Sequence, residues 1–209
     1  EGLRQCTTAI NAAGKKRLWR EAVRLVAGLW KARLPPDSFI YSSAMKVCAR
    51  SQHWEPALGL YLEMQECRVP LNRVVCSTVV STCGRGGLWV LALDALADMC
   101  GQRPGPEVSA PDEVNYNKAI SVCGDGRAWG SAMQLVGAMR SHDLEPDVIT
   151  YSGSMTACVG AGVWEAALRL STEMQQRSLR SDAISFNTAV GACEASQHWG
   201  HALAVLECM

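Results

Sequence analysis

Residues 113–147 read EVNYNKAISVCGDGRAWGSAMQLVGAMRSHDLEPD, and this stretch decides the fold of the chain. Its last two residues are Pro146 and Asp147, and a tryptophan stands near its middle. Five of its residues stand at offsets that recur along the chain, namely Tyr116, Cys123, Trp129, Ala132 and Met139. Fixed offsets of this kind mark one unit of an internal repeat.

Tryptophans set the period of the repeat. Six of the seven are spaced by 35, 35, 40, 35 and 35 residues, and they are Trp19, Trp54, Trp89, Trp129, Trp164 and Trp199. An alanine follows each of them after three residues, and a methionine follows each of the last five after ten. A cysteine precedes each of the last five by six residues. The coincidence of these offsets establishes a repeat of about 35 residues.

The offsets divide residues 3–209 into six units that we interpret as one array. The third unit carries five extra residues, which we place in the Pro/Gly-rich stretch Gly101–Pro111 as a lengthened loop. The units are 3–37, 38–72, 73–112, 113–147, 148–182 and an incomplete 183–209.

Each unit is predicted to form two helices. In residues 148–182, apolar side chains recur at helical spacing up to Cys158, Gly160 and Gly162 interrupt the pattern, and Trp164 resumes it. The alanine inside each second helix lets two helices approach closely. Neither helix can bury its apolar stripe alone, so neighbouring units must stack. The sequence therefore predicts an all-α fold, a right-handed α-solenoid of about six two-helix units.

Composition excludes several classes of protein. The chain has 209 residues, 48% of them apolar, with 20 Lys+Arg and 20 Asp+Glu. The apolar content and balanced charge exclude a disordered chain. No stretch of about 18 uncharged apolar residues occurs, so we expect no membrane-spanning segment. The zero net charge argues against binding nucleic acid through bulk charge alone. We expect most of the cysteines, methionines and tryptophans to pack in the core, with the thiols reduced.

Motifs for chemistry are missing. No C-x-x-C, P-loop, G-x-S-x-G or H-E-x-x-H is present. His53-Trp54-Glu55 matches H-x-E by letter, but it stands at an inter-helix turn and no C-x-x-C follows it. We expect no catalytic residue, no metal site, no cofactor and no small-molecule substrate.

The repeat resembles the pentatricopeptide repeat (PPR). The resemblance rests on the 35-residue helical pair, the tyrosine near its start, the alanine and methionine of its second helix, and Pro-Asp at its close, and it covers essentially residues 3–209. Here tryptophan opens the second helix, where the family pattern usually has leucine. The tetratricopeptide repeat is a weaker match, because its period is 34 and its tryptophan lies near the start of the first helix.

The resemblance implies that the chain binds single-stranded RNA, one base per unit, through the fifth and last residue of each unit. The pairs are Thr7 with Asp37, Ser42 with Asn72, Ser77 with Asp112, Asn117 with Asp147, and Ser152 with Asp182, and Asn187 stands alone in the last unit. The family's pairing tendencies predict the register 5′-G-A-G-U-G followed by a pyrimidine. Asp or Asn before a helix also acts as an N-cap, so capping remains the alternative role for the closing residues.

Two further sets of residues follow from the resemblance. The second residue of each unit usually flanks a base; Arg4 departs from this pattern, and the apolar residues that fit it are Phe39, Val74, Val114, Ile149 and Ile184. A basic residue late in the first helix often contacts phosphate, and here these are Lys15, Arg50 and Arg85. The later units have Asp125, Gly160 and Ala195 there, so a solvated surface is the alternative and any electrostatic grip should fade along the array.

Two functions are consistent with these features. The first is an RNA-binding protein of a mitochondrion or chloroplast, acting in transcript processing, stability or translation; the chain starts at Glu1 and shows no targeting peptide. The second is a scaffold subunit of a large organellar ribonucleoprotein or protein assembly, which the zero net charge favours. Neither end resembles a polar cap, so we expect a longer array or ends that protein partners cover.

Overall fold

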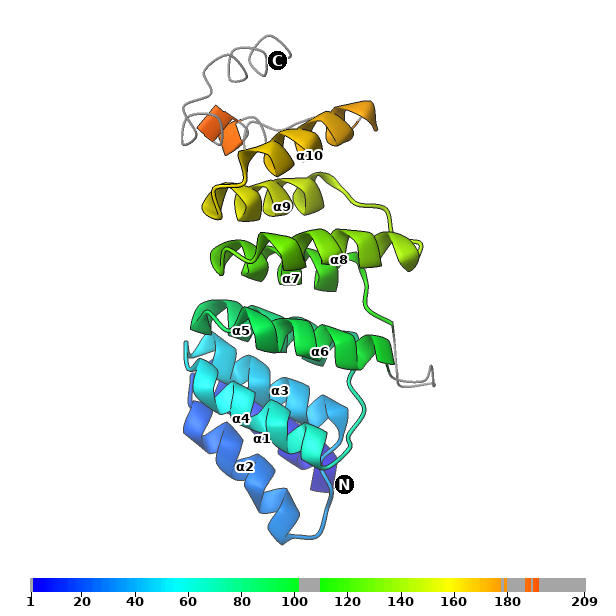
Figure 1. Cartoon of the computed structure of the whole chain (residues 1–209). Coiled ribbons are helices and arrows are strands. Elements are labelled where there is room, and N and C mark those ends of the chain that lie inside the picture. Colours follow the sequence, from blue (N-terminus) through cyan, green and yellow to red (C-terminus); the bar gives the residue numbers. More distant parts are fainter. Residues whose placement is uncertain (1, 102–109, 178, 180–186, 189, 192–209) are drawn as a thin grey trace. The chain divides into compact units, whose positions relative to one another are not determined.

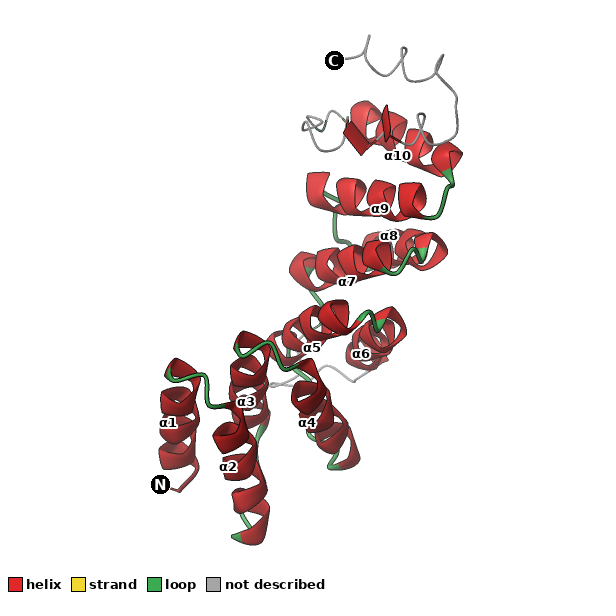
Figure 2. Cartoon of the chain, turned by 90° about the vertical axis from the view of Figure 1, so that its left-hand side faces the viewer, coloured by secondary structure: helices red, strands yellow, loops and turns green. Residues whose placement is uncertain are grey.

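The computed structural model describes residues 2–101, 110–177, 179, 187, 188, 190 and 191. In this part of the chain it contains ten α-helices and no strand (Figure 1 and Figure 2). The predicted all-α fold of helical repeats is thus confirmed, whereas its right-handed sense stays a prediction. The helices are α1 (Gly2–Lys15), α2 (Trp19–Lys31), α3 (Ser38–Arg50), α4 (Trp54–Glu66), α5 (Arg73–Gly86), α6 (Trp89–Gly101), α7 (Glu113–Asp125), α8 (Trp129–Ser141), α9 (Val148–Gly160) and α10 (Trp164–Gln176).

The helix boundaries follow the repeat. Each even-numbered helix begins at one of the repeat tryptophans. A residue with positive φ closes the preceding turn: Gly87 (66°) and Gly162 (76°) fill this place without steric cost, while Arg17 (56°), Gln52 (62°) and Arg127 (53°) fill it at about 1 kcal/mol each.

The chain divides into two compact units, residues 1–111 with α1–α6 and residues 112–209 with α7–α10. In the first compact unit, α3 packs on α1 and α5, and each odd-numbered helix packs on the even-numbered helix that follows it. In the second compact unit, α9 packs on α7 and also contacts α8 and α10. Within each compact unit, the first helices of consecutive repeats therefore stack directly on one another. That both units belong to a single array stays a prediction.

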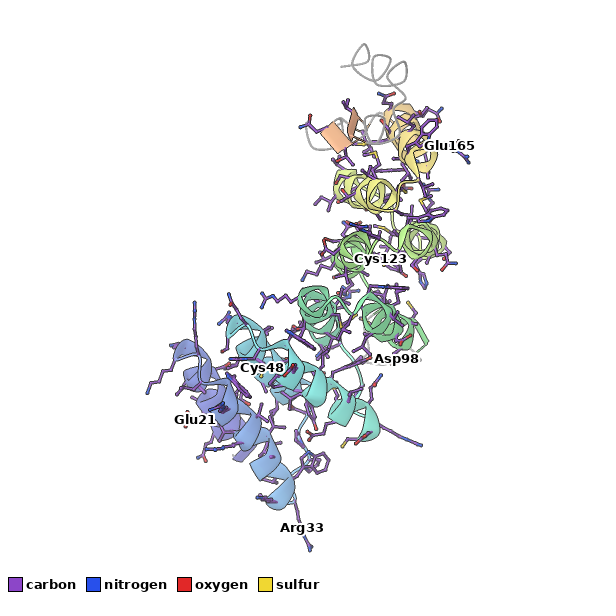
Figure 3. The ribbon with its side chains drawn as sticks, turned by 60° about the vertical axis from the view of Figure 1, so that its left-hand side comes forward. Glu21, Arg33, Cys48, Asp98, Cys123 and Glu165 are labelled. Atoms are coloured by element: carbon purple, nitrogen blue, oxygen red, sulfur yellow. The ribbon has the colours of Figure 1, made fainter. Side chains whose placement is uncertain are left out.

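The core consists of the repeated small and sulfur-containing side chains. The alanine of each second helix is at most 2% exposed from Ala22 to Ala167, and Met64, Met99, Met139 and Met174 are at most 1% exposed. Five cysteines of the first helices are fully buried, namely Cys48, Cys76, Cys83, Cys123 and Cys158, and Figure 3 labels Cys48 and Cys123. Core packing is thus confirmed for these cysteines and methionines.

The repeat tryptophans are less deeply buried than the cysteines and methionines, although Trp164 packs against buried side chains of α9 and α10. Trp129 is 39% exposed, and the other four described ones are only partly buried. They lie at the turns because they open their helices, and two of them contact the turn of the next repeat. Trp19 lies 4.7 Å from the His53 ring, and a Cβ on Gly86 would come within 3.2 Å of the Trp54 ring. Trp19 and Trp54 therefore join the turns of consecutive repeats.

Some predicted features lie outside the described residues. They are most of the extra loop of the third unit, at 102–109, and most of the sixth unit. None of the helices in the described ranges combines the length and hydropathy needed to cross a bilayer.

Candidate nucleic-acid interface

The closing residues of the units all cap the helix that follows. An Oδ1 atom accepts a hydrogen bond from the backbone N–H three residues later in Asp37 (2.8 Å to Ile40), Asn72 (2.8 Å to Val75), Asp112 (3.0 Å to Asn115) and Asp147 (2.8 Å to Thr150). The predicted capping role is therefore present at each of them. One oxygen of a carboxylate suffices for a cap, so capping and a contact from the second oxygen are compatible. Asp182 lies outside the described residues.

The hydroxyls of three fifth residues are turned back onto their own helices. Thr7 Oγ1 donates to the Leu3 carbonyl at 2.9 Å, Ser42 Oγ donates to the Phe39 carbonyl at 2.9 Å, and Ser152 Oγ donates to the Ile149 carbonyl at 3.1 Å. Because the single proton is used in this way, each hydroxyl offers an outside group only its lone pairs.

The fifth residues differ in accessibility. Ser42 is only 3% exposed, whereas Thr7, Ser77, Asn117 and Ser152 are partly exposed. Asn187 is helical and exposed. Ser77 and its partner Asp112 belong to different compact units, so their pairing stays a prediction.

The structure brings Asn117 and Asp147 together. Asn117 Nδ2 donates to Asp147 Oδ1 at 3.1 Å, across the contact between α7 and α9. Thr150, the third residue of α9, joins them: its Oγ1 lies 2.6 Å from Asn117 Oδ1 and 2.8 Å from Asp147 Oδ1. The predicted pair is thus a single hydrogen-bonded cluster at the start of α9.

Asn72, which closes the second repeat, makes a comparable contact within the first compact unit. Its Nδ2 donates to Ser38 Oγ at 2.7 Å, while its Oδ1 accepts from Val75 N. These two bonds fix which side of the amide carries the nitrogen. The second N–H of that nitrogen takes no part in either bond.

Exposed apolar side chains stand beside these polar groups. They occupy the second position of four units, and their exposed fractions are 60% for Phe39, 42% for Val74, 55% for Val114 and 63% for Ile149. Apolar side chains left in water at equivalent places, each one turn from a fifth residue, are what a planar apolar ligand such as a nucleobase would cover. Nothing is described of the side chains of Arg4 and Ile184.

The three predicted phosphate-contacting cations are exposed at the ends of their helices. Lys15 ends α1, Arg50 ends α3, and Arg85 lies in the last turn of α5. A cation at this end also interacts favourably with the helix dipole. The Arg85 guanidinium donates to the Ala49 carbonyl of α3, so it also joins two consecutive repeats.

Sequence reasoning missed a cluster that links consecutive repeats. In the first compact unit, Tyr41 donates to Glu63 Oε1 at 3.0 Å and Trp30 Nε1 donates to the same atom at 2.7 Å. In the second compact unit, Tyr151 donates to Glu173 at 3.1 Å, and Arg140 pairs with the same carboxylate. The available signal was an acid directly before the repeat methionine, as in Glu63-Met64, Asp98-Met99 and Glu173-Met174.

These acids also shift the pKa of their tyrosines. Burial and then Glu63 raise the pKa of the Tyr41 hydroxyl, and burial and Glu173 do the same for Tyr151. The hydroxyls therefore stay protonated and act as donors to the carboxylates. No group of three or more potential metal ligands occurs within the described ranges.

The fold and these contacts define a protein of stacked two-helix repeats. Residues 39–69 match the PPR repeat model and residues 134–196 match the pentatricopeptide repeat domain model. The chain belongs to the pentatricopeptide repeat family. No curated protein sequence matches it.

Solved structures agree with this assignment. The PPR10 protein from maize is 22% identical over 97% of this chain, with a TM-score of 0.66, and its complex with an 18-nt psaJ RNA element is 25% identical over 99%, with a TM-score of 0.61. The chain spans only 28% of the length of either. The PPR domain of the Arabidopsis thaliana protein-only RNase P 1, in complex with tRNA, is 13% identical over 81% of this chain and 87% of that one, with a TM-score of 0.67.

Proposed function

We propose that this chain binds single-stranded RNA, that it reads about one base per repeat, and that it acts without chemistry of its own on transcripts of a mitochondrion or chloroplast. Processing, stability and translation of the transcript are the steps that such binding would serve. The observation that carries the proposal is the pairing of Asn117 with Asp147 beside the exposed apolar Val114 and Ile149. The maize relative solved with an RNA element supports it.

The fourth unit fits uracil. Within the cluster, Asn117 Nδ2 keeps one N–H and Asp147 keeps Oδ2, so the pair offers a donor beside an acceptor. The Watson–Crick edge of uracil offers the complement, because its N3–H donates and its O2 and O4 accept. Cytosine would place the lone pair of its N3 against the carboxylate, which is repulsive.

The second unit fits adenine. The remaining N–H of Asn72 can donate to N1 of adenine, and no carboxylate opposes that lone pair. The low exposure of Ser42 implies that Asn72 makes most of the contact in this unit. In the three pairs that combine Thr or Ser with Asp, a carboxylate that accepts from N1–H and N2–H of guanine favours that base.

A fluorescence-anisotropy titration tests the proposal. The chain is titrated against GAGUGU RNA and a scrambled oligomer, each at two salt concentrations. We expect weak, salt-sensitive binding with a clear preference for GAGUGU. Equal binding to both oligomers that disappears at the higher salt would contradict base reading.

Exchange of fifth residues provides a matched test inside the chain. Asn117→Thr gives the fourth unit the Thr/Asp pair of the first, so the preferred fourth base should change from U to G. Thr7→Asn gives the first unit the Asn/Asp pair of the fourth, so the preferred first base should change from G to U. If neither exchange alters the preferred base, the chain does not read RNA through these pairs.

The second candidate is a scaffold within an organellar ribonucleoprotein or protein assembly. Exposed apolar side chains away from the second positions favour it, with Leu18 46%, Leu62 48% and Val90 52% exposed. Under this function the exchanges at Asn117 and Thr7 leave RNA choice unchanged. Polar substitution of Leu62 and Val90 would then weaken recovery of the chain with its assembly.

A further inference from the structure

Thr150 is a buried hydroxyl whose position the RNA-reading pairs do not explain. Its side chain is 0% exposed, and it is the third residue of α9. Four groups lie within reach of its Oγ1: Asn117 Oδ1 at 2.6 Å, Asp147 Oδ1 at 2.8 Å, the Asp147 N–H at 3.2 Å and Met139 Sδ at 3.8 Å.

The hydroxyl has one proton, and the contacts decide where it goes. Asp147 Oδ1 already accepts from the Thr150 N–H and from Asn117 Nδ2. Asn117 Oδ1 receives a proton in this cluster only from Thr150, at the shortest of the four distances. Donated to Asp147 Oδ1, the proton would leave Thr150 Oγ1 facing Asn117 Oδ1 at 2.6 Å; donated to Asn117, it leaves the longer 2.8 Å contact with Asp147 Oδ1, so the hydroxyl donates to Asn117.

Both ends of the Asn117 amide are then held. Thr150 binds the oxygen and Asp147 binds the nitrogen. A flipped amide would place Asn117 Oδ1 about 3 Å from the Asp147 carboxylate, which is repulsive. The free N–H therefore stays beside Asp147 Oδ2, which is the arrangement that complements uracil.

The pairs of the first and second units lack this device and do not need it. The residues equivalent to Thr150 after the first and second units are Ile40 and Val75, which carry no hydroxyl. The fifth residues there are Thr7 and Ser42, whose hydroxyls bond their own helices. An amide has two distinguishable ends and can flip, whereas a hydroxyl has no such ambiguity.

We propose that Thr150 is a positioning residue that orients the Asn117 amide and thereby makes the fourth unit select uracil over cytosine. This inference rests on the proposed function. Without the hydroxyl, Asn117 Oδ1 loses its donor in the cluster, and only the Asp147 carboxylate then opposes turning that oxygen toward the base. The oxygen would then accept from N4–H of cytosine, so the discrimination between the two pyrimidines falls.

The test compares Thr150→Val, which keeps the shape, with Thr150→Ser, which keeps the hydroxyl. Dissociation constants are measured for GAGUGU and GAGCGU, and also for AAGUGU as a control for the first unit. Since a hydrogen bond contributes about 1 kcal/mol, we expect the preference for U over C to fall about fivefold in Thr150→Val. It should stay near the parental value in Thr150→Ser, and the first-base preference should be unchanged in both.

A purely structural role gives a different result. Thr150→Val would then weaken binding to GAGUGU and GAGCGU by the same factor and leave their ratio unchanged, which would overturn the inference. A parent chain with no preference for U over C would instead overturn the proposed function of the fourth unit, and this inference with it.

A transfer experiment avoids any loss of folding at Thr150. In the second unit, Ser42→Asn with Asn72→Asp builds the Asn/Asp pair beside Val75. Adding Val75→Thr should raise the preference for U over C at the second base about fivefold relative to the double variant. An equal preference with and without Val75→Thr would contradict a positioning role for this residue.

Discussion

At the scale of single residues, four cysteines at one position of the first helices behave as core side chains. Cys48, Cys83, Cys123 and Cys158 are all 0% exposed. Burial raises the pKa of the Cys48, Cys83 and Cys123 thiols to about 11. The thiolate is the reactive and metal-binding form, so at neutral pH these thiols are inert. The use of these four among the 10 cysteines of the chain is therefore structural.

We predict that alkaline pH unfolds the chain partly through these thiols. An unfolded thiol ionises near pH 9, whereas the pKa of Cys48 is about 11 in the folded chain. Between these values the unfolded state binds fewer protons, so the free energy of unfolding falls as pH rises. The loss should begin near pH 9 and reach about 2 kcal/mol per thiol near pH 11.

Urea unfolding at pH 7.5, 9 and 10.5 under reducing conditions measures this effect. Cys48→Ala removes one titrating group, so its stability should fall less steeply than that of the parent. Cys67→Ala, at an exposed cysteine, is the matched control and should follow the parent. Parallel curves for Cys48→Ala and the parent would show that the buried thiol does not titrate as expected.

At the scale of the helix, one residue serves both the fold and the site. Asp37 caps α3 through one oxygen and is exposed, so its second oxygen can contact a base. The two roles can be separated, because serine also accepts from the third backbone N–H of a helix. Asp37→Ser should therefore leave the free energy of unfolding within a few tenths of a kcal/mol, while Asp37→Ala should lower it by about 1 kcal/mol.

The same two variants report on RNA. Both should lose the preference for G at the first base, because neither has a carboxylate. Thermal unfolding and competition between GAGUGU and AAGUGU give the two readouts. If Asp37→Ser keeps the parental base preference, then Asp37 acts as a cap and does not contact the base.

The helices were predictable from the sequence because each unit carries its own signals. Tryptophan opened every described second helix, and Asp or Asn capped four of the described first helices. The candidate pairs came from the resemblance to the pentatricopeptide repeat, which assigns base reading to the fifth and last residues of each repeat. The burial of Ser42 and the contacts of Thr150 could not be predicted from the sequence, because they depend on how the first helices of consecutive repeats pack. Spacing within one unit says nothing about that packing.

At the scale of the whole molecule, the balanced charge conceals an uneven distribution. The net charge is zero, yet the first three units each place a cation late in their first helix, at Lys15, Arg50 and Arg85. The fourth and fifth have Asp125 and Gly160 there. Electrostatic contact with RNA is thus expected from the N-terminal units, and base contacts must supply most of the affinity elsewhere.

The salt dependence of RNA binding tests this local charge. Three phosphate contacts with a single strand predict a slope of about −2 in log K against log salt. Lys15→Gln with Arg50→Gln should reduce the magnitude of that slope by about 1.4. Lys31→Gln with Arg33→Gln is the matched control, since it removes the same charge at the far end of α2, where Arg33 points away from the helix (Figure 3). If both double variants reduce the slope equally, net charge governs binding and the placement of Lys15 and Arg50 does not.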